Sequence, residues 1–92
     1  MSEEELTQYI TCYEDCTLQY LEALAMNGLA IKAYTEDCDR RNFKRIIILL
    51  YNGAKIVSKC SYIEEVQQSL RIINVYIGIN RKNRSWEKIE IK

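Results

Sequence analysis

Apolar residues recur along this chain at steps of three and four, the spacing that places side chains on one side of an α-helix. The stripe over the first third of the chain consists of Leu6, Tyr9, Ile10, Tyr13, Cys16, Tyr20, Leu21, Leu24 and Ile31. Ser2 followed by three glutamates is typical of a capped helix N-terminus. We therefore predict a first helix over about residues 3–34, and Asn27-Gly28 is the point where a break would fall.

A second helix is predicted over about residues 40–60, where one side is again apolar: Phe43, Ile46, Ile47, Leu50, Ala54 and Val57. The alternative is a β-hairpin that turns at Asn52-Gly53. Residues 43–51 do not alternate between polar and apolar types, whereas a helical period gathers the cations on one side. On that ground we favour the helix.

A third helix is predicted over about residues 62–79, capped by Ser61, with the apolar stripe Ile63, Val66, Leu70, Ile73 and Ile77. Residues 80–92 then form a short basic tail. Because the 92 residues include three glycines and no proline, we expect one all-α domain. Its simplest form is a small antiparallel bundle of three main helices whose open side is completed by dimerisation.

Acidic and basic residues are segregated along the chain. Residues 1–39 contain nine acids and one base, whereas residues 40–92 contain four acids and twelve bases, so the net charge of zero is the sum of −8 and +8. Such a pattern favours pairing between the two halves, pairing with an identical chain, or binding of an anionic partner by the basic half.

The composition also excludes several function classes. The chain has no histidine, the commonest general base and metal ligand, and no nucleophile has an evident base, so we expect neither catalysis nor a cofactor. The longest apolar run, residues 46–51, is short for a membrane span, and the acidic N-terminus does not resemble a secretion signal. We predict a cytoplasmic protein without membrane contact, and the abundance of Ile, Lys, Asn and Tyr suits a viral or mobile-element protein.

The four cysteines allow two interpretations. Cys12 and Cys16 stand one helical turn apart, and folding the chain back at residues 35–39 would place Cys60 beside Cys16 and leave Cys38 at the far end. Three neighbouring thiols would form a Cu(I) or redox site, which is one alternative function. We favour buried apolar thiols and assign no metal site.

The function we predict is a small non-catalytic protein–protein interaction or regulatory protein, which acts through a charge-segregated helical bundle and binds itself or another protein. The other alternative is binding of nucleic acid or a phosphorylated ligand by the basic face of the second helix and the C-terminal tail. The candidate surface consists of Tyr9, Tyr13, Tyr20, Arg41, Lys44, Arg45, Lys55, Lys59 and Trp86.

Overall fold

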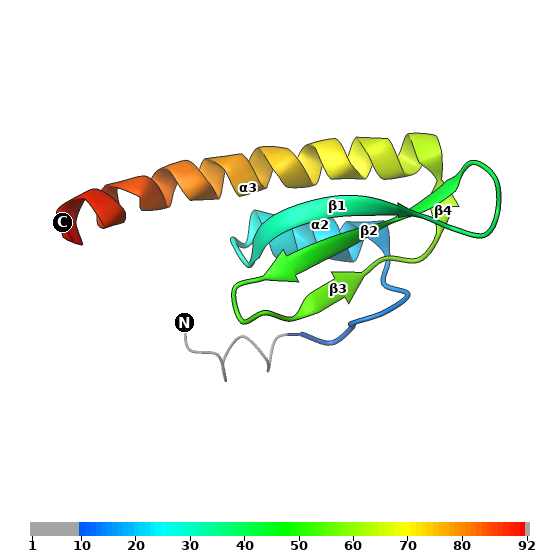
Figure 1. The fold of residues 1–92 in the computed structure, drawn as a ribbon, viewed down its shortest axis with the longest axis horizontal. Coiled ribbons are helices and arrows are strands. Elements are labelled where there is room, and N and C mark those ends of the chain that lie inside the picture. Colours follow the sequence, from blue (N-terminus) through cyan, green and yellow to red (C-terminus); the bar gives the residue numbers. More distant parts are fainter. Residues whose placement is uncertain (1–9, 92) are drawn as a thin grey trace.

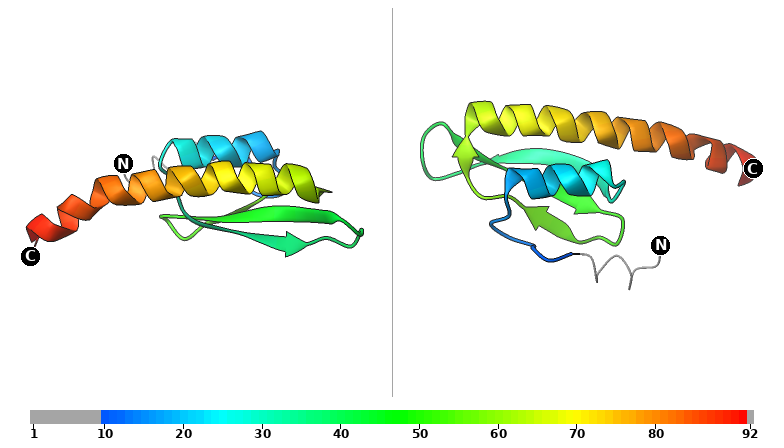
Figure 2. Two further views of the ribbon diagram at one scale, coloured as in Figure 1. Left: turned by 90° about the horizontal axis from the view of Figure 1, so that it is seen from above. Right: turned by 180° about the vertical axis from the view of Figure 1, so that it is seen from behind.

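The computed structural model describes the backbone of residues 10–91 and the side chains of residues 10–81. Within this range the chain forms an α+β fold of two helices and a four-stranded antiparallel sheet. The elements, in chain order, are α2 (Leu18–Met26), β1 (Ala30–Asp37), β2 (Phe43–Leu50), β3 (Lys55–Val57), β4 (Ser61–Tyr62) and α3 (Ile63–Ile91). Both helices lie on the same side of the sheet, so the other side is uncovered by any element of the described range (Figures 1 and 2).

The predicted all-α bundle is therefore wrong, and the error lies mainly in residues 40–60. This segment forms β2 and β3, the hairpin that the sequence argument rejected. Ile46, Ile48 and Leu50 face the helices in the core, while Ile47 is buried outside that core cluster. A strand that is apolar on both faces shows no polar–apolar alternation, which is why the alternation test failed here.

The turn of this hairpin has three residues rather than the two of a type I′ turn. The Gly53 amide donates to the Leu50 carbonyl (3.0 Å), and the Leu50 amide donates to the Ala54 carbonyl (2.9 Å). Gly53 has a φ of 88°, a left-handed conformation that glycine adopts readily and that closes a bulged three-residue loop. The turn therefore fixes the register in which Ile47 lies opposite Val57 and Leu49 opposite Lys55.

The predicted first helix is also corrected. Its described part is helical only over Leu18–Met26, between the Thr17 N-cap and the Asn27 C-cap, and Gly28 follows with a φ of 79°. Residues 30–37, expected in part to continue this helix, form β1. The start of the predicted helix, residues 3–9, lies outside the described residues.

The third helix extends further than expected. α3 begins at Ile63 and continues to Ile91, so the described part of the expected tail is helical rather than irregular. Its inner side packs on the sheet and on α2 through the buried residues Val66, Ile73 and Ile77. The Asn80 amide group donates to the Ala25 carbonyl at the end of α2 (3.1 Å), which ties the two helices together. Neither helix in the described range is both long enough and apolar enough to cross a membrane.

The two outer edges of the sheet differ. The segment before α2 runs beside β3, where the Val57 amide donates to the Tyr13 carbonyl (2.8 Å) and the Cys16 amide donates to the Val57 carbonyl (3.1 Å). At the opposite edge, β1 pairs with β2 only, and no other described strand borders it. The sheet is thus extended at β3 by the segment before α2, whereas at β1 no described strand extends it and α3 lies along its outer side (Figure 1).

Candidate protein-interaction surface

The uncovered side of the sheet, which we call the open face, is built from alternate residues of three strands. Residues that lie opposite one another in an antiparallel register point to the same face of the sheet. The register places Tyr34, Ile47 and Val57 in one row and Lys32, Leu49 and Lys55 in the next. A third, shorter row consists of Glu36 and Arg45.

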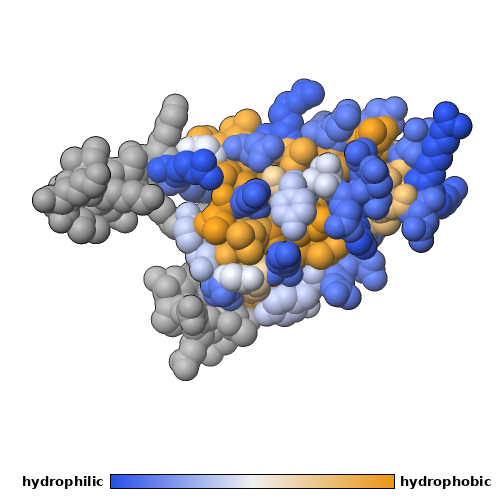
Figure 3. Space-filling model, viewed as in Figure 1, coloured by the Kyte–Doolittle hydropathy of each residue, from blue (hydrophilic) through white to orange (hydrophobic). Residues whose placement is uncertain are grey.

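The centre of the open face is apolar. Ile47 is only 4% exposed although no described helix covers it, and its opposite neighbours Tyr34 and Val57 flank it in the register. Tyr34 is 37% exposed, whereas Leu49 and Val57 are half-buried. Figure 3, seen from the strand side, shows apolar areas over the middle of the sheet, divided by some polar side chains and bordered by more hydrophilic residues. An apolar centre with a polar rim is typical of a protein-binding surface.

Charged side chains border this apolar centre. Lys32 and Lys55 stand on either side of Leu49, and the Lys32 ammonium lies 5.9 Å from the centre of the Tyr34 ring. In the third row, the Arg45 guanidinium donates to the Glu36 carboxylate. This hydrogen bond and the attraction of the carboxylate raise the pKa of Arg45 above its usual value, so the group stays charged. Lys32 and Lys55 are therefore the cations of these three rows that have no acidic partner among the described side chains.

The two described tyrosines of the predicted surface, Tyr13 and Tyr20, differ in exposure and position. Tyr13 is exposed beside β3, whereas Tyr20 packs against the core from α2 and its hydroxyl accepts a hydrogen bond from the Thr11 amide (2.9 Å). Tyr9 lies outside the described residues, and the side chain of Trp86 lies outside the described side chains. Of the predicted aromatic residues that are described, only Tyr13 is exposed, and it lies at the covered edge of the sheet.

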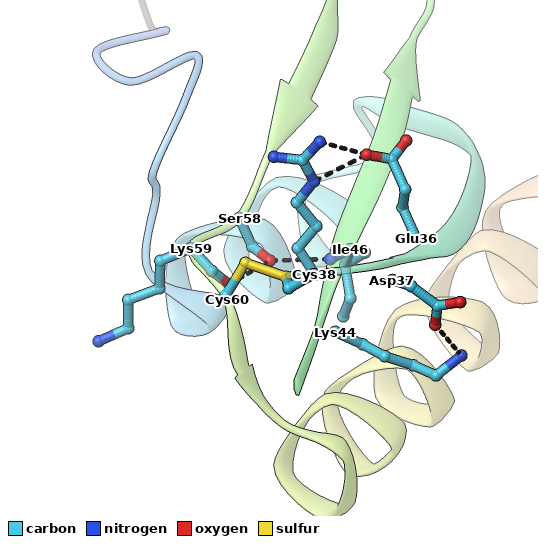
Figure 4. The surroundings of a disulfide bond; sticks show 9 residues. Glu36, Asp37, Cys38, Lys44, Ile46, Ser58, Lys59 and Cys60 are labelled. Atoms are coloured by element: carbon cyan, nitrogen blue, oxygen red, sulfur yellow. Dashed lines mark hydrogen bonds and ion pairs between the residues drawn. A yellow bond between two sulfur atoms is a disulfide. The ribbon is translucent and has the colours of Figure 1, made fainter. Parts of the chain in front are cut away.

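The predicted cations are also dispersed, because consecutive residues of a strand point to opposite faces. Arg45 lies on the open face, whereas Lys44 lies on the helix side and pairs with Asp37 (2.9 Å) at the end of β1 (Figure 4). Lys55 lies on the open face, Lys59 in the connection between β3 and β4, and Arg41 in the β1–β2 turn. The basic helical stripe therefore does not exist.

The four cysteines form two disulfides, so neither the buried apolar thiols that we favoured nor the cluster of three thiols is present. Cys12 bonds with Cys16, and Cys60 bonds with Cys38, the residue that we expected at the far end. The second disulfide joins the end of β1 to the connection between β3 and β4 (Figure 4). The turn between β1 and β2 brings these ends together, since the Cys38 amide donates to the Phe43 carbonyl (3.1 Å). Among the described residues there is no free cysteine and no group of side chains suited to hold a metal ion.

Sequence reasoning missed the residues that make the open face: Tyr34, Ile47, Leu49 and Val57. One signal was available, because Lys32, Tyr34 and Glu36 alternate with Ala33 and Thr35 in a two-residue period typical of a strand. The longer helical stripe obscured it.

A second apolar surface lies on α3. Val75 is 54% exposed and Ile79 is 47% exposed, and with Ile72 and Tyr76 they line a shallow groove beside Arg71. All five residues that line this groove belong to α3.

The chain was compared with family models, curated proteins and solved structures, and it matches none of them.

Proposed function

We propose that this chain is a non-catalytic protein-interaction module that binds its partner through the open face of the sheet. The observation that supports the proposal is the row Tyr34–Ile47–Val57 with the adjacent Leu49, which forms an apolar centre on a face that no described element covers. Covering such a surface with a partner removes its apolar side chains from water, at roughly 25 cal/mol per Å². This gain favours association.

The rim indicates the chemistry of the partner. Lys32 and Lys55 border the apolar centre, and the remaining pair, Glu36 with Arg45, is neutral as a unit. A complementary partner surface has apolar side chains at its centre and carboxylates at its edge. We therefore propose a protein partner that presents an acidic-rimmed apolar patch.

The test compares two variants that introduce the same charge on different surfaces. Leu49→Glu places a carboxylate in the middle of the open face, where Lys32 and Lys55 stand on either side of it. Val75→Glu makes the same kind of change on the exposed side of α3. Proteins retained by immobilised wild-type chain from an extract of its source cells are quantified by mass spectrometry for all three baits. Each candidate is then purified and titrated by calorimetry.

The proposed partner binds the wild-type chain and Val75→Glu equally and binds Leu49→Glu at least about tenfold more weakly, which corresponds to about 1.4 kcal/mol. Hydrogen exchange in the complex should show protection of β1 and β2. A partner that is lost with Val75→Glu and retained by Leu49→Glu would place the interface on α3 and refute the proposal.

Nucleic-acid binding is a second candidate, supported by one group of aromatic and basic side chains at the start of β2. The Arg40 guanidinium lies 4.6 Å from the centre of the Phe43 ring, and the Phe43 ring lies 4.7 Å from that of Tyr62. Exposed aromatic rings beside arginine bind unpaired bases by stacking. Asp37 and Asp39 line the same hollow as Arg40 and disfavour phosphate there. Binding of an oligothymidine that weakens steeply with salt would favour this candidate.

A cytoplasmic location is retained as a proposal, and the two disulfides argue against it. Disulfides persist mainly in oxidising compartments or in the cells of hyperthermophiles. Counting free thiols in protein extracted under acid quench would decide between reduced and oxidised chains in the cell.

A further inference from the structure

The chain contains two Asn-Gly pairs, Asn27-Gly28 and Asn52-Gly53, and both lie in turns of the described structure. Such a pair is open to an intramolecular reaction, because glycine has no side chain to hinder the attack of its backbone nitrogen on the preceding carboxamide. The structure holds the two carboxamides differently, so the two pairs should not react alike.

The Asn52 carboxamide is folded over the glycine that follows it. Its oxygen accepts a hydrogen bond from the Ala54 amide, two residues ahead (2.9 Å), which is the contact of an Asx-turn. This contact keeps the carboxamide beside the Gly53 backbone and polarises its carbonyl group. It therefore favours both the approach of the Gly53 nitrogen and the negative charge that develops on the carboxamide oxygen.

The Asn27 carboxamide is turned the other way. Its nitrogen donates to the Ala23 carbonyl (2.7 Å), one turn back along α2, so the group is held away from Gly28. Gly28 is buried, whereas Gly53 is exposed, and nothing beyond its chain neighbours lies within 4 Å of the place that a Cβ would take. An exposed turn opens locally at a smaller free-energy cost than a buried one.

One contact is common to the two sites. The Gly53 amide donates to the Leu50 carbonyl and the Gly28 amide donates to the Ala25 carbonyl, both at 3.0 Å. At either site the amide must leave this bond and lose its proton before the nitrogen can attack. The difference in rate therefore comes from the position of the carboxamide and from the ease with which the turn opens.

We propose that Asn52 is a site of spontaneous modification, at which the chain converts asparagine into aspartate and isoaspartate without an enzyme. A base from the solvent removes the Gly53 amide proton, the nitrogen bonds to the Asn52 carboxamide carbon, and the amide group takes up a proton and leaves as ammonia. Water then opens the succinimide ring that has formed. Opening at the side-chain carbonyl gives aspartate, and opening at the main-chain carbonyl gives isoaspartate.

Either product places a new carboxylate in the turn between β2 and β3, next to the row of Lys32, Leu49 and Lys55. This negative charge repels a partner that has an acidic rim. The effect on the partner rests on the function proposed above, whereas the reaction at Asn52 does not.

The test follows both sites in one protein by peptide mapping. The wild-type chain is incubated at mildly basic pH, and mass spectrometry quantifies the replacement of NH2 by OH in the peptides that contain positions 27 and 52. In the folded chain, Asn52 should convert at least about tenfold faster than Asn27. In urea with reductant the two rates should approach each other, because unfolding removes the contacts that distinguish the carboxamides.

The products and two variants complete the test. Chromatography should separate aspartyl and isoaspartyl forms of the peptide with position 52, since a succinimide opens in both ways. Asn52→Gln should abolish the conversion at position 52, because glutamine would have to close a larger ring, and Asn27→Gln should leave it unchanged. Three results would overturn the inference: equal rates at Asn27 and Asn52 in the folded chain, an Asn52 that converts only after unfolding, or a product without isoaspartate.

Discussion

The disulfide between Cys38 and Cys60 should contribute a large share of the stability of this small domain. Its two cysteines are separated by 22 residues, a segment that contains the whole of β2 and β3. Closing a loop of this length restricts the unfolded chain, and the chain-entropy estimate for such a loop is about 3 kcal/mol at 25 °C. Total stabilities of small domains are roughly 5–15 kcal/mol, so the loss would be easily measured.

The variant for this test is the double substitution Cys38→Ala with Cys60→Ala. Cys38 is half-buried and Cys60 is exposed, so removing the sulfur atoms sacrifices little packing and the effect comes mainly from the lost link. Urea unfolding followed by circular dichroism should give a free energy of unfolding about 3 kcal/mol below that of the oxidised wild type. The denaturant slope should rise, because the unlinked chain exposes more surface on unfolding.

Reduction of the wild-type chain provides a control, since it removes the link without substitution. A loss of less than about 1 kcal/mol in the double variant, with the disulfide of the wild type verified by mass spectrometry, would refute the loop argument. An unchanged slope together with a large loss would show that the bond acts on the native state instead.

Two further predictions concern the buried serine at position 58 and the glycines at positions 53 and 78. The buried Ser58 hydroxyl accepts a hydrogen bond from the Ile46 amide (2.8 Å) and donates one to the Lys59 carbonyl (3.0 Å). Ser58→Ala should therefore lower the free energy of unfolding, measured by urea titration, by about 1–3 kcal/mol. An unchanged free energy of unfolding would mean that water replaces the hydroxyl. Gly53→Ala should lower the free energy of unfolding by about 1–2 kcal/mol, because the φ of Gly53 is 88°. Gly78 lies in open space on α3, so Gly78→Ala should raise the free energy of unfolding by up to about 1 kcal/mol. Equal effects of the two glycine substitutions in thermal unfolding would contradict this assignment.

Sequence reasoning located α3 near its start, because the stripe from Ile63 to Ile77 marks a helix that buries one side only. The predicted cap was wrong, since Ser61 lies in β4 and the helix begins at Ile63. The reasoning failed where a segment is apolar on both sides. In β2, Ile46 and Ile48 face the helices while Ile47 lies outside the core cluster, so the period of two that identifies a strand is absent from the residue types. The same error turned adjacent Lys44 and Arg45 into one basic stripe.

The residues of the candidate surface likewise could not be grouped from the sequence alone. The open face required the register, since Tyr34, Ile47 and Val57 are distant in sequence and meet only because β1, β2 and β3 are hydrogen-bonded side by side. The cysteine pairing likewise depended on which ends the turns bring together, and a helical geometry led to the wrong neighbours.

Local chemistry along the chain was sufficient to indicate the helix of α3 from its apolar stripe, and it marked Asn27-Gly28 as the place where a break would fall and Asn52-Gly53 as a turn signal, because left-handed glycines act within a few residues. Whether the run from Phe43 to Leu50 became a helix or a strand was decided only by tertiary structure. Its isoleucines are buried on one face by the helices and on the other by neighbouring strands. That burial exists only once segments distant in sequence have come together.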